Sequence, residues 1–170
     1  MNITPPAKEE YPEYFQKYIS KVHGDPIKEL TTGLKDLHRF ISKLSKKQLA
    51  YRYAEGKWNI KEILVHMMDA ERVFCYRALR FARNDETSLS SFDENEWVPN
   101  SGAADRKVKS IMGEYEAVRN ATIAFFANMN DEMFNRSGIA NGKQFSVRSI
   151  LYIISGHVLH HIEIIKERYL

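Results

Sequence analysis

Residues 59–83 read NIKEILVHMMDAERVFCYRALRFAR, and this stretch decides the fold class. Its apolar side chains recur at steps of three and four residues, which is the period of an amphipathic α-helix. The members of this stripe are Ile63, Met67, Ala70, Phe74, Ala78 and Phe81. Asn59 stands three residues before Glu62, the spacing of a helix-capping box, with asparagine in place of the usual serine or threonine. We therefore predict a helix that begins after Asn59 and ends near Arg83.

The same period marks three further stretches of the chain. One begins at Asp25 and Pro26, a capping residue followed by proline at the first helical position, and extends to about Leu44. Another covers about residues 106–129, and the last begins after Ser146 and continues to the C-terminus. Four amphipathic helices of roughly 20–25 residues each predict an all-α protein, a four-helix bundle.

The connections between these helices differ in length. Residues 84–105 show no period and are rich in Ser, Asn, Asp and Glu, so we expect a loop of about 20 residues, which is long for a compact domain. A loop of that length can cross the whole bundle, which would let the second and third helices run parallel. The other connections are expected to be short, and Asn141 with Gly142 predicts a hairpin turn before the last helix.

Composition excludes several classes of protein. The 170 residues suit one domain, which we expect to span 1–170 with residues 1–24 as an N-terminal extension that carries a short helix. With 44% hydrophobic and 28% charged residues, the chain is not of the disordered class. No apolar run approaches about 18 residues, so we expect no membrane span. The N-terminus lacks the apolar core of a signal peptide, and Cys75 is the single cysteine, so we predict a cytoplasmic protein. The net charge of +3, with basic and acidic residues interleaved, argues against nucleic-acid binding.

Six histidines are distributed along the chain, and helical geometry separates them. Successive residues of an α-helix are rotated by about 100°, so angles around the axis follow from the spacing. Relative to Ile154, His161 lies at about −20° and His157 at about −60°. His160 lies at about −120°, on the flank of the helix. His157 and His161 therefore form an i, i+4 pair directed at the core.

His66 completes this pair if two helices are neighbours. It lies at about −60° from Ile63, at the margin of the inward face, and near the start of its helix. If that helix and the last helix are antiparallel neighbours, His66, His157 and His161 meet at one end of the bundle. Three neutral imidazoles at about 2.0–2.1 Å hold a divalent metal and leave a position open for water or substrate, which is the pattern of a catalytic site.

Other interpretations of the histidines stay open. Buried histidines can be hydrogen-bonded core residues, although two imidazoles that face a core without a partner are costly. His38, at the edge of its helix's apolar stripe, is a fallback ligand. His23 belongs to a helix end, and His160 could support the ligands or contact a partner.

Acidic residues near the predicted site also allow two readings. Asp69, one turn after His66, is a candidate catalytic residue that could act as a general base, and it could equally be a solvated carboxylate. In the long loop, one of three polar residues could form a lid over the metal, anchored by Phe92 or Trp97, or the segment could be a surface turn. The three polar residues are Asp93, Glu94 and Asn95.

Three stretches of the chain together resemble the DinB-like superfamily, also called the DinB/YfiT group. They are GKWNIKEILVHMMDAERVFCYRALRFARND at 56–85, FDENEW at 92–97 and NGKQFSVRSILYIISGHVLHHIEIIKERYL at 141–170. The resemblance covers nearly all of the chain from Pro26 to Leu170. It implies a four-helix bundle with up-down-down-up topology. It also implies a divalent metal, nickel or zinc, held by His66, His157 and His161.

The resemblance has further implications for activity and partners. Members of the family are often homodimers, and characterised relatives include S-transferases and isomerases that use low-molecular-weight thiols such as bacillithiol or mycothiol. In such enzymes a metal lowers the pKa of the thiol, and the thiolate is the nucleophile. The resemblance therefore implies a small-molecule substrate and a low-molecular-weight thiol as cosubstrate.

Together, these features lead us to expect a metal-dependent enzyme that acts as a hydrolase or as a thiol-dependent S-transferase on a small electrophile. The alternative is a non-catalytic, dimeric metal-binding or stress-response protein, which a fourth protein ligand on the metal would favour. In either case, metal affinity should fall as the pH drops through the range in which an ordinary histidine protonates, because a protonated imidazole cannot ligate.

Overall fold

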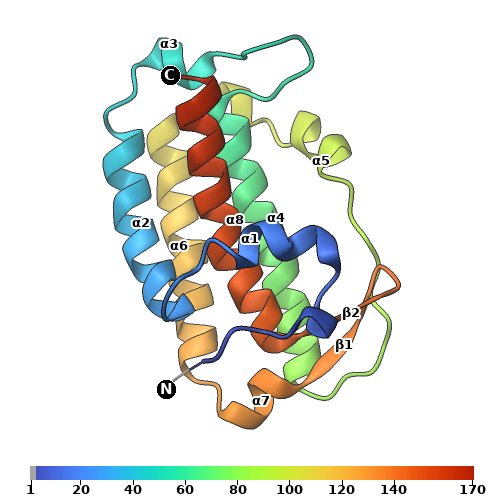
Figure 1. The fold of residues 1–170 in the computed structure, drawn as a ribbon. Helices are drawn as coiled ribbons and strands as arrows, with labels where there is room; N and C mark the ends of the chain where they lie inside the picture. The colour runs from blue at the N-terminus through green and yellow to red at the C-terminus, as the bar shows by residue number, and fades with distance from the viewer. Residues whose placement is uncertain (1–2) are drawn as a thin grey trace.

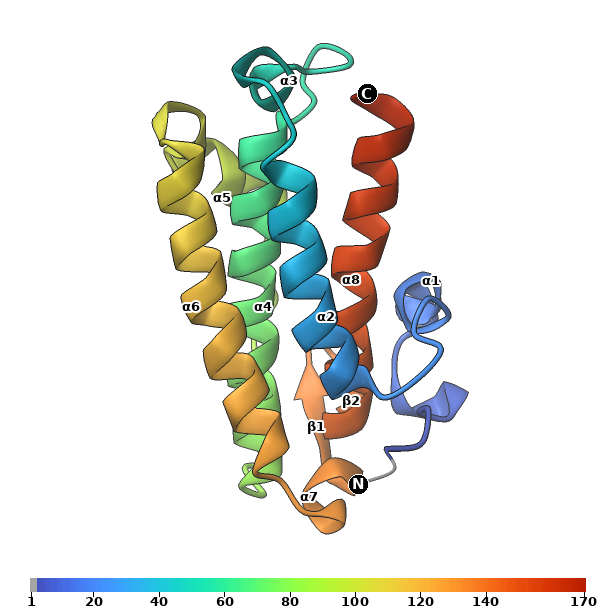
Figure 2. The same cartoon turned by 90° about the vertical axis from the view of Figure 1, so that its left-hand side faces the viewer.

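The structure, a computed structural model, describes residues 3–170 and contains a bundle of four long helices. These helices are α2 (Pro26–Ile41), α4 (Ile60–Ala82), α6 (Val108–Ala127) and α8 (Val147–Arg168). In Figures 1 and 2, α2 and α8 run towards the upper end of the bundle, whereas α4 and α6 run towards the lower end. The predicted all-α four-helix bundle is confirmed, and α4 and α6 are parallel because the long connection crosses the bundle between them.

Local capping explains where the long helices begin. Asn59 accepts a hydrogen bond from the Glu62 amide at 3.0 Å, and the Glu62 carboxylate accepts one from the Asn59 amide at 2.7 Å. Ser146 caps α8 by accepting from the Ser149 amide at 3.0 Å. These contacts satisfy backbone donors that have no partner inside the helix. The capping signals in the sequence therefore fixed the start of α4 and α8 correctly.

Two connections contain more structure than the sequence led us to expect. The segment between α2 and α4 is not short, and it holds α3 (Lys46–Ala50), which is capped by Ser45 and Gln48. Residues 84–105, expected to be a loop, contain α5 (Glu94–Asn100) and a 3₁₀ turn at Ala103–Asp105. Both helices are too short to show an apolar period, and a single side chain of each is buried. Neither short helix could therefore be recognised from an apolar period in the sequence.

The lower end of the bundle is closed by α7 (Asp131–Asn135) and an antiparallel hairpin of β1 (Ser137–Ala140) and β2 (Lys143–Ser146). Asn141 and Gly142 at the hairpin turn have φ angles of 51° and 65°, as the two-residue turn predicted from their sequence requires. The crossing segment is attached to this hairpin, because the Leu89 amide donates to the Ile139 carbonyl at 2.9 Å.

The N-terminal segment lies against the outer side of α8. It contains 3₁₀ turns at Lys8–Glu10 and Glu13–Phe15, followed by α1 (Gln16–Ile19). In Figure 2, α1 lies beside α8 on the side away from α6. Arg148 of α8 holds the segment through an ion pair with Glu10, whose carboxylate accepts from Nε at 2.8 Å. Gly156 allows the close approach, since a Cβ there would lie 1.9 Å from the Tyr18 carbonyl oxygen.

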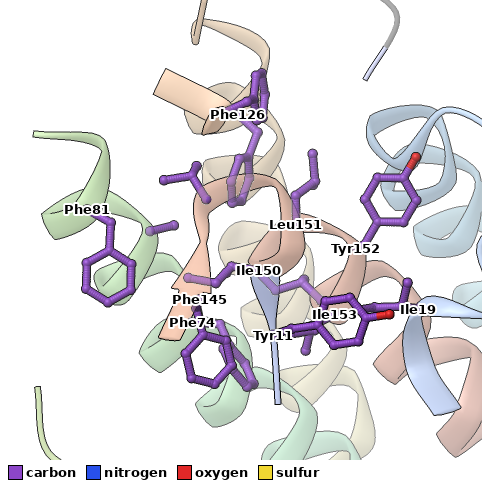
Figure 3. Packing of buried hydrophobic residues seen from close by; sticks show 14 of the residues in the cluster. Tyr11, Ile19, Phe74, Phe81, Phe126, Phe145, Ile150, Leu151, Tyr152 and Ile153 are labelled. Atoms are coloured by element: carbon purple, nitrogen blue, oxygen red, sulfur yellow. The ribbon is translucent and has the colours of Figure 1, made fainter. Parts of the chain in front are cut away.

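The apolar interior divides into a lower and an upper cluster. The lower cluster is rich in aromatic rings, and Figure 3 shows side chains from α4, α6, β2, α8 and the N-terminal segment meeting there. The upper cluster joins the start of α4 to the ends of α2 and α8. On α6 the buried face includes a charged residue, because Arg119 and Phe126 are fully buried whereas Val118 and Phe125 are half-buried. Within residues 3–170, no helix combines the length and apolar character that crossing a membrane requires.

Candidate metal centre

Three histidines from two antiparallel helices meet in the upper half of the bundle. Nε2 of His157 lies 3.2 Å from Nε2 of His66 and 2.9 Å from Nε2 of His161. The potential ligand atoms of all three lie within 4.8 Å of one another. The structure thus brings together the three residues that the helical rotation singled out, because α4 and α8 are adjacent and His66 lies level with the later half of α8.

The two histidines of α8 differ in burial, and the helical rotation predicts the opposite difference. His157 is buried, whereas His161, at the centre of the stripe, is only partly buried. The reason is the N-terminal segment, which covers the outer flank of α8. The Tyr18 ring lies edge-on to His157, with ring centres 5.1 Å apart, and contacts His160 at 5.2 Å. The rotation around a long helix takes no account of the N-terminal segment, so it could not predict that this segment covers His157.

All three imidazoles are neutral at ordinary pH. Burial lowers the pKa of His66 to about 4. Burial also holds the pKa values of His157 and His161 well below the usual range, and the neighbouring histidines lower both further. A cluster of this kind avoids the repulsion of adjacent imidazolium ions, and it presents nitrogen lone pairs instead of positive charge.

The donor set suits a divalent cation. One shared proton can join only two imidazole nitrogens, so three converging Nε2 atoms cannot all be satisfied by one another. Tetrahedral ligands at about 2.0–2.1 Å from an ion lie roughly 3.3 Å apart, close to the two Nε2 separations seen here. Within residues 3–170, the three histidines form the one group of three or more His, Cys, Asp or Glu side chains with metal-ligand spacing. The group therefore offers three ligands and not four.

A pocket of about 220 Å³ opens beside this cluster, and His161 forms part of its wall. The other walls come from the segment before α4, the end of α8 and the short helix α5. Trp58 lines the pocket and also packs on His66, with ring centres 4.9 Å apart. Asn95 of α5 lines it from the crossing segment. Of the three polar residues proposed as a lid, Asn95 is the one that reaches the pocket, while Phe92 and Trp97 pack together at 5.0 Å.

Asp69 lies away from the three histidines. Its carboxylate contacts Arg72 at 3.4 Å, and Arg72 binds Glu114 of α6 at 2.6 Å. Asp69 therefore faces α6, whereas His66 faces α8. Burial raises the pKa of Asp69, and the carboxyl group belongs to a surface network between two helices. The structure does not bring this candidate general base to the site.

The remaining histidines take other positions. His160 is half-buried between Tyr18 and the ring of His161, beside the cluster and outside the group of three. His38 lies on α2 with its Nε2 3.7 Å from Glu116, and His23 is exposed in the turn before α2. The structure places neither of them with the three clustered histidines.

Two aromatic residues of the site were missed from sequence. Tyr18 lies in the N-terminal segment, and Trp58 lies in the connection that was expected to be short. Neither belongs to the period of a long helix, so a helical wheel gives them no position. Trp58 carried a weak signal, since it directly precedes the cap of α4, and a large ring there must lie near the end at which His66 is placed.

Sequence comparison identifies the family. A model of the DinB superfamily matches residues 29–165, which is most of the chain. The chain belongs to the DinB superfamily. Among curated proteins, it is 24% identical over 153 residues to a "Putative metal-dependent hydrolase" of Oceanobacillus iheyensis, a match that covers 87% of this chain and 85% of the relative. A protein of the same name from Geobacillus kaustophilus is 24% identical over 150 residues, covering 86% and 79%.

Two solved structures share the fold of this chain. YfiT from Bacillus subtilis, described as a probable metal-dependent hydrolase with an unusual four-helix bundle topology, superposes with a TM-score of 0.73 at 18% identity. That match covers 96% of this chain and 90% of YfiT. A mycothiol-dependent maleylpyruvate isomerase superposes with a TM-score of 0.65 at 14% identity over 84% of this chain and 58% of the isomerase. At these identities the likeness concerns the fold alone.

Proposed function

We propose that this DinB-superfamily chain is a metal-dependent enzyme in which His66, His157 and His161 hold one divalent ion. The observation that carries the proposal is the convergence of three neutral Nε2 atoms beside a pocket. A divalent ion bound there acts as a Lewis acid and lowers the pKa of a water or thiol that reaches it. Nickel and zinc both accept imidazole ligands, and we propose one of these as the resident metal.

The surrounding residues have separate roles in this proposal. Tyr18 packs on His157 from the N-terminal segment, and Trp58 packs on His66 from the segment before α4. Both rings cover part of the imidazole surface and so reduce its contact with water. His161 is the ligand that borders the pocket, so a substrate would approach the metal from its side.

A structural metal is the second candidate function, and the ligand count argues against it. A structural site is normally closed by a fourth protein ligand. Within the described residues, no further His, Cys, Asp or Glu joins the group of three. An open position next to a pocket is the arrangement that a reaction needs.

The reaction that we propose is the transfer of a nucleophile to a small electrophile, with water or a low-molecular-weight thiol as the nucleophile. The names of the curated relatives support hydrolysis, and the fold shared with a mycothiol-dependent enzyme supports the thiol. Assembly as a homodimer, expected from the family resemblance, stays a prediction.

Metal content tests the proposal directly. The purified or reconstituted protein should contain about one divalent ion per chain, measured by elemental analysis. His161→Ala should lose the ion, because it removes one of three ligands. The matched control, His160→Ala, should retain it, since His160 is the neighbouring residue but lies outside the group. No metal in the wild-type protein after reconstitution, or equal loss in both variants, would overturn the proposal.

Activity assays then separate the two nucleophiles. The metal-loaded protein is incubated with a panel of small electrophiles, with and without a low-molecular-weight thiol, and the products are analysed by mass spectrometry. A thioether product that requires the thiol indicates S-transfer, and a product that gains water indicates hydrolysis. Either product should disappear in His161→Ala and persist in His160→Ala.

A further inference from the structure

The pocket beside His161 has walls of a distinctive kind. Three of its lining residues are aromatic, namely Tyr53, Trp58 and Tyr169. Ile63 and Ile164 add aliphatic surface. Walls of this composition favour a ligand with a planar, apolar body, because rings stack on flat groups and gain from removing apolar area from water.

The aromatic walls are held in place by one another. The Tyr169 hydroxyl donates to the Trp58 carbonyl at 2.7 Å, which ties the end of α8 to the segment before α4. The Tyr53 and Tyr169 rings meet edge to face, with centres 5.1 Å apart at 88°. A pocket formed in advance loses little side-chain freedom when it binds a ligand.

The size of the pocket limits the ligand. A volume of about 220 Å³ is below the roughly 300–1,000 Å³ of pockets that hold drug-sized molecules. A ligand of one ring with a short substituent fits this space.

The charge on the pocket wall is positive. Lys57 is the single ionisable cation among the lining residues, and no Asp or Glu lines the pocket. Within residues 3–170, the Lys57 ammonium forms no ion pair. The nearby Glu62 carboxylate is already bound by Arg52 at 2.6 Å. An anionic group in the pocket would therefore find one cationic residue in the lining and no carboxylate.

From these observations we infer that the pocket takes a small anion with a planar, apolar body, such as an aromatic or unsaturated carboxylate. Its negative group lies towards Lys57, its body lies against the aromatic walls, and its reacting carbon lies on the His161 side. Asn95 provides an amide for a polar substituent. The inference rests on the proposed function for the chemistry at His161, and it adds the class of substrate.

Three probes of similar size test the charge preference without any metal. Benzoate, benzamide and benzylamine share one ring and differ in charge. The chain has two tryptophans, so Trp97→Phe leaves Trp58 as the fluorescent reporter inside the pocket. In the metal-free protein, benzoate should change Trp58 fluorescence at the lowest concentration and benzylamine at the highest. Equal affinities, a preference for benzylamine, or no change with any probe would overturn the inference.

Two lysine substitutions test whether the preference for benzoate depends on Lys57. Lys57→Gln should weaken benzoate binding about threefold and leave benzamide binding unchanged, because an exposed charge contributes modestly. Lys47→Gln is the matched control, since Lys47 is an exposed lysine of α3 outside the pocket. Equal effects of the two substitutions, or a loss of benzamide binding in Lys57→Gln, would show that Lys57 does not select an anion.

A cobalt(II)-loaded sample separates this inference from the proposed function. Benzoate should alter the visible absorption bands of the bound cobalt, because His161 belongs to both the metal group and the pocket wall. If the protein binds no metal but prefers benzoate, the proposed function fails and the pocket inference stands. If metal binds and benzoate shows no preference over benzamide, the pocket inference fails alone.

Discussion

Two clusters of ionisable side chains are buried in the same bundle, and they differ in how their polar atoms are satisfied. In one, Arg119 of α6 meets Glu71 of α4, and its side chain is 1% exposed. In the other, three histidines from α4 and α8 face each other. Arg119 Nη2 donates to Glu71 at 2.7 Å and to the Tyr115 hydroxyl at 2.8 Å, and Nε donates to Glu71 at 2.9 Å. The first cluster is complete as it stands.

The comparison shows what separates a structural cluster from a functional one. Opposite charges that satisfy each other need nothing further and fasten α4 to α6. Three like groups with converging lone pairs need a cation that the chain does not provide. Burial alone does not distinguish the two clusters, since each contains buried ionisable side chains. The chemical identity of the partners distinguishes them.

Arg119→Met should give the largest change in stability. It leaves the Glu71 carboxylate buried without its partner, and breaking one side of a buried pair costs about 3–5 kcal/mol. Urea unfolding measures the effect. Arg72→Met is the control, because Arg72 is about half-exposed and its pair with Glu114 should contribute less than about 1 kcal/mol. Equal losses in the two variants would contradict the structural role of Arg119.

Acid should destabilise the metal-free protein through the histidine cluster. Burial lowers the folded-state pKa of His66 to about 4, below the ordinary value of 6.5. Between these values the unfolded chain binds more protons, so stability is full above about pH 6.5 and is lost as pH falls towards 4. Proton uptake at His66 in the unfolded chain alone lowers the free energy of unfolding by roughly 3 kcal/mol as the pH falls through this window. Unfolding curves at several pH values should show this slope in the wild type and a weaker one in His66→Gln.

The same lowered pKa corrects the pH range expected for metal binding. An ordinary histidine would lose its ligand form below about pH 6.5. In the folded protein, the three imidazoles are neutral well below that pH. Metal affinity should therefore hold to a lower pH than the sequence alone indicated. A loss of affinity centred near pH 6.5 would mean that the cluster is more open to water than the structure shows.

Much of this site could be predicted because it depends on helical rotation. His66, His157 and His161 lie on long helices, where a fixed angle per residue places each side chain. Tyr18 and Trp58 lie in segments without a period, and their positions depend on how those segments pack. Arg119 had a signal that was not recognised: it lies one turn after Tyr115, on the inner face, where a charged residue must find a buried partner.

Metal binding should stabilise the protein through the histidine cluster, independently of the pair between Arg119 and Glu71. A ligand that binds only the folded state at 100 times its Kd adds about 2.7 kcal/mol to stability. Thermal unfolding with zinc should show this gain in the wild type and in Arg119→Met, and no gain in His157→Ala. If zinc did not stabilise Arg119→Met, the two clusters would be energetically coupled.

Gly156→Ala should give a smaller effect than the changes above, because it alters the segment that covers the histidine cluster and leaves the ligands in place. The new methyl group would overlap the Tyr18 carbonyl, so α1 must move away from α8. Overpacking of this kind costs about 1–3 kcal/mol. Hydrogen exchange should increase in residues 16–22, while the metal remains bound, since His157 keeps its position on α8.

A second glycine gives the matched control for this substitution. Gly113 of α6 has no atom within 4 Å of an added Cβ, so Gly113→Ala should stabilise the helix by about 0.5–1 kcal/mol. Opposite signs for the two alanines would show that Gly156 exists to seat the N-terminal segment on α8. If both alanines changed stability in the same direction, the N-terminal segment would not pack tightly over the outer side of His157. The histidine cluster would then be as accessible to water from that side of α8 as from the pocket.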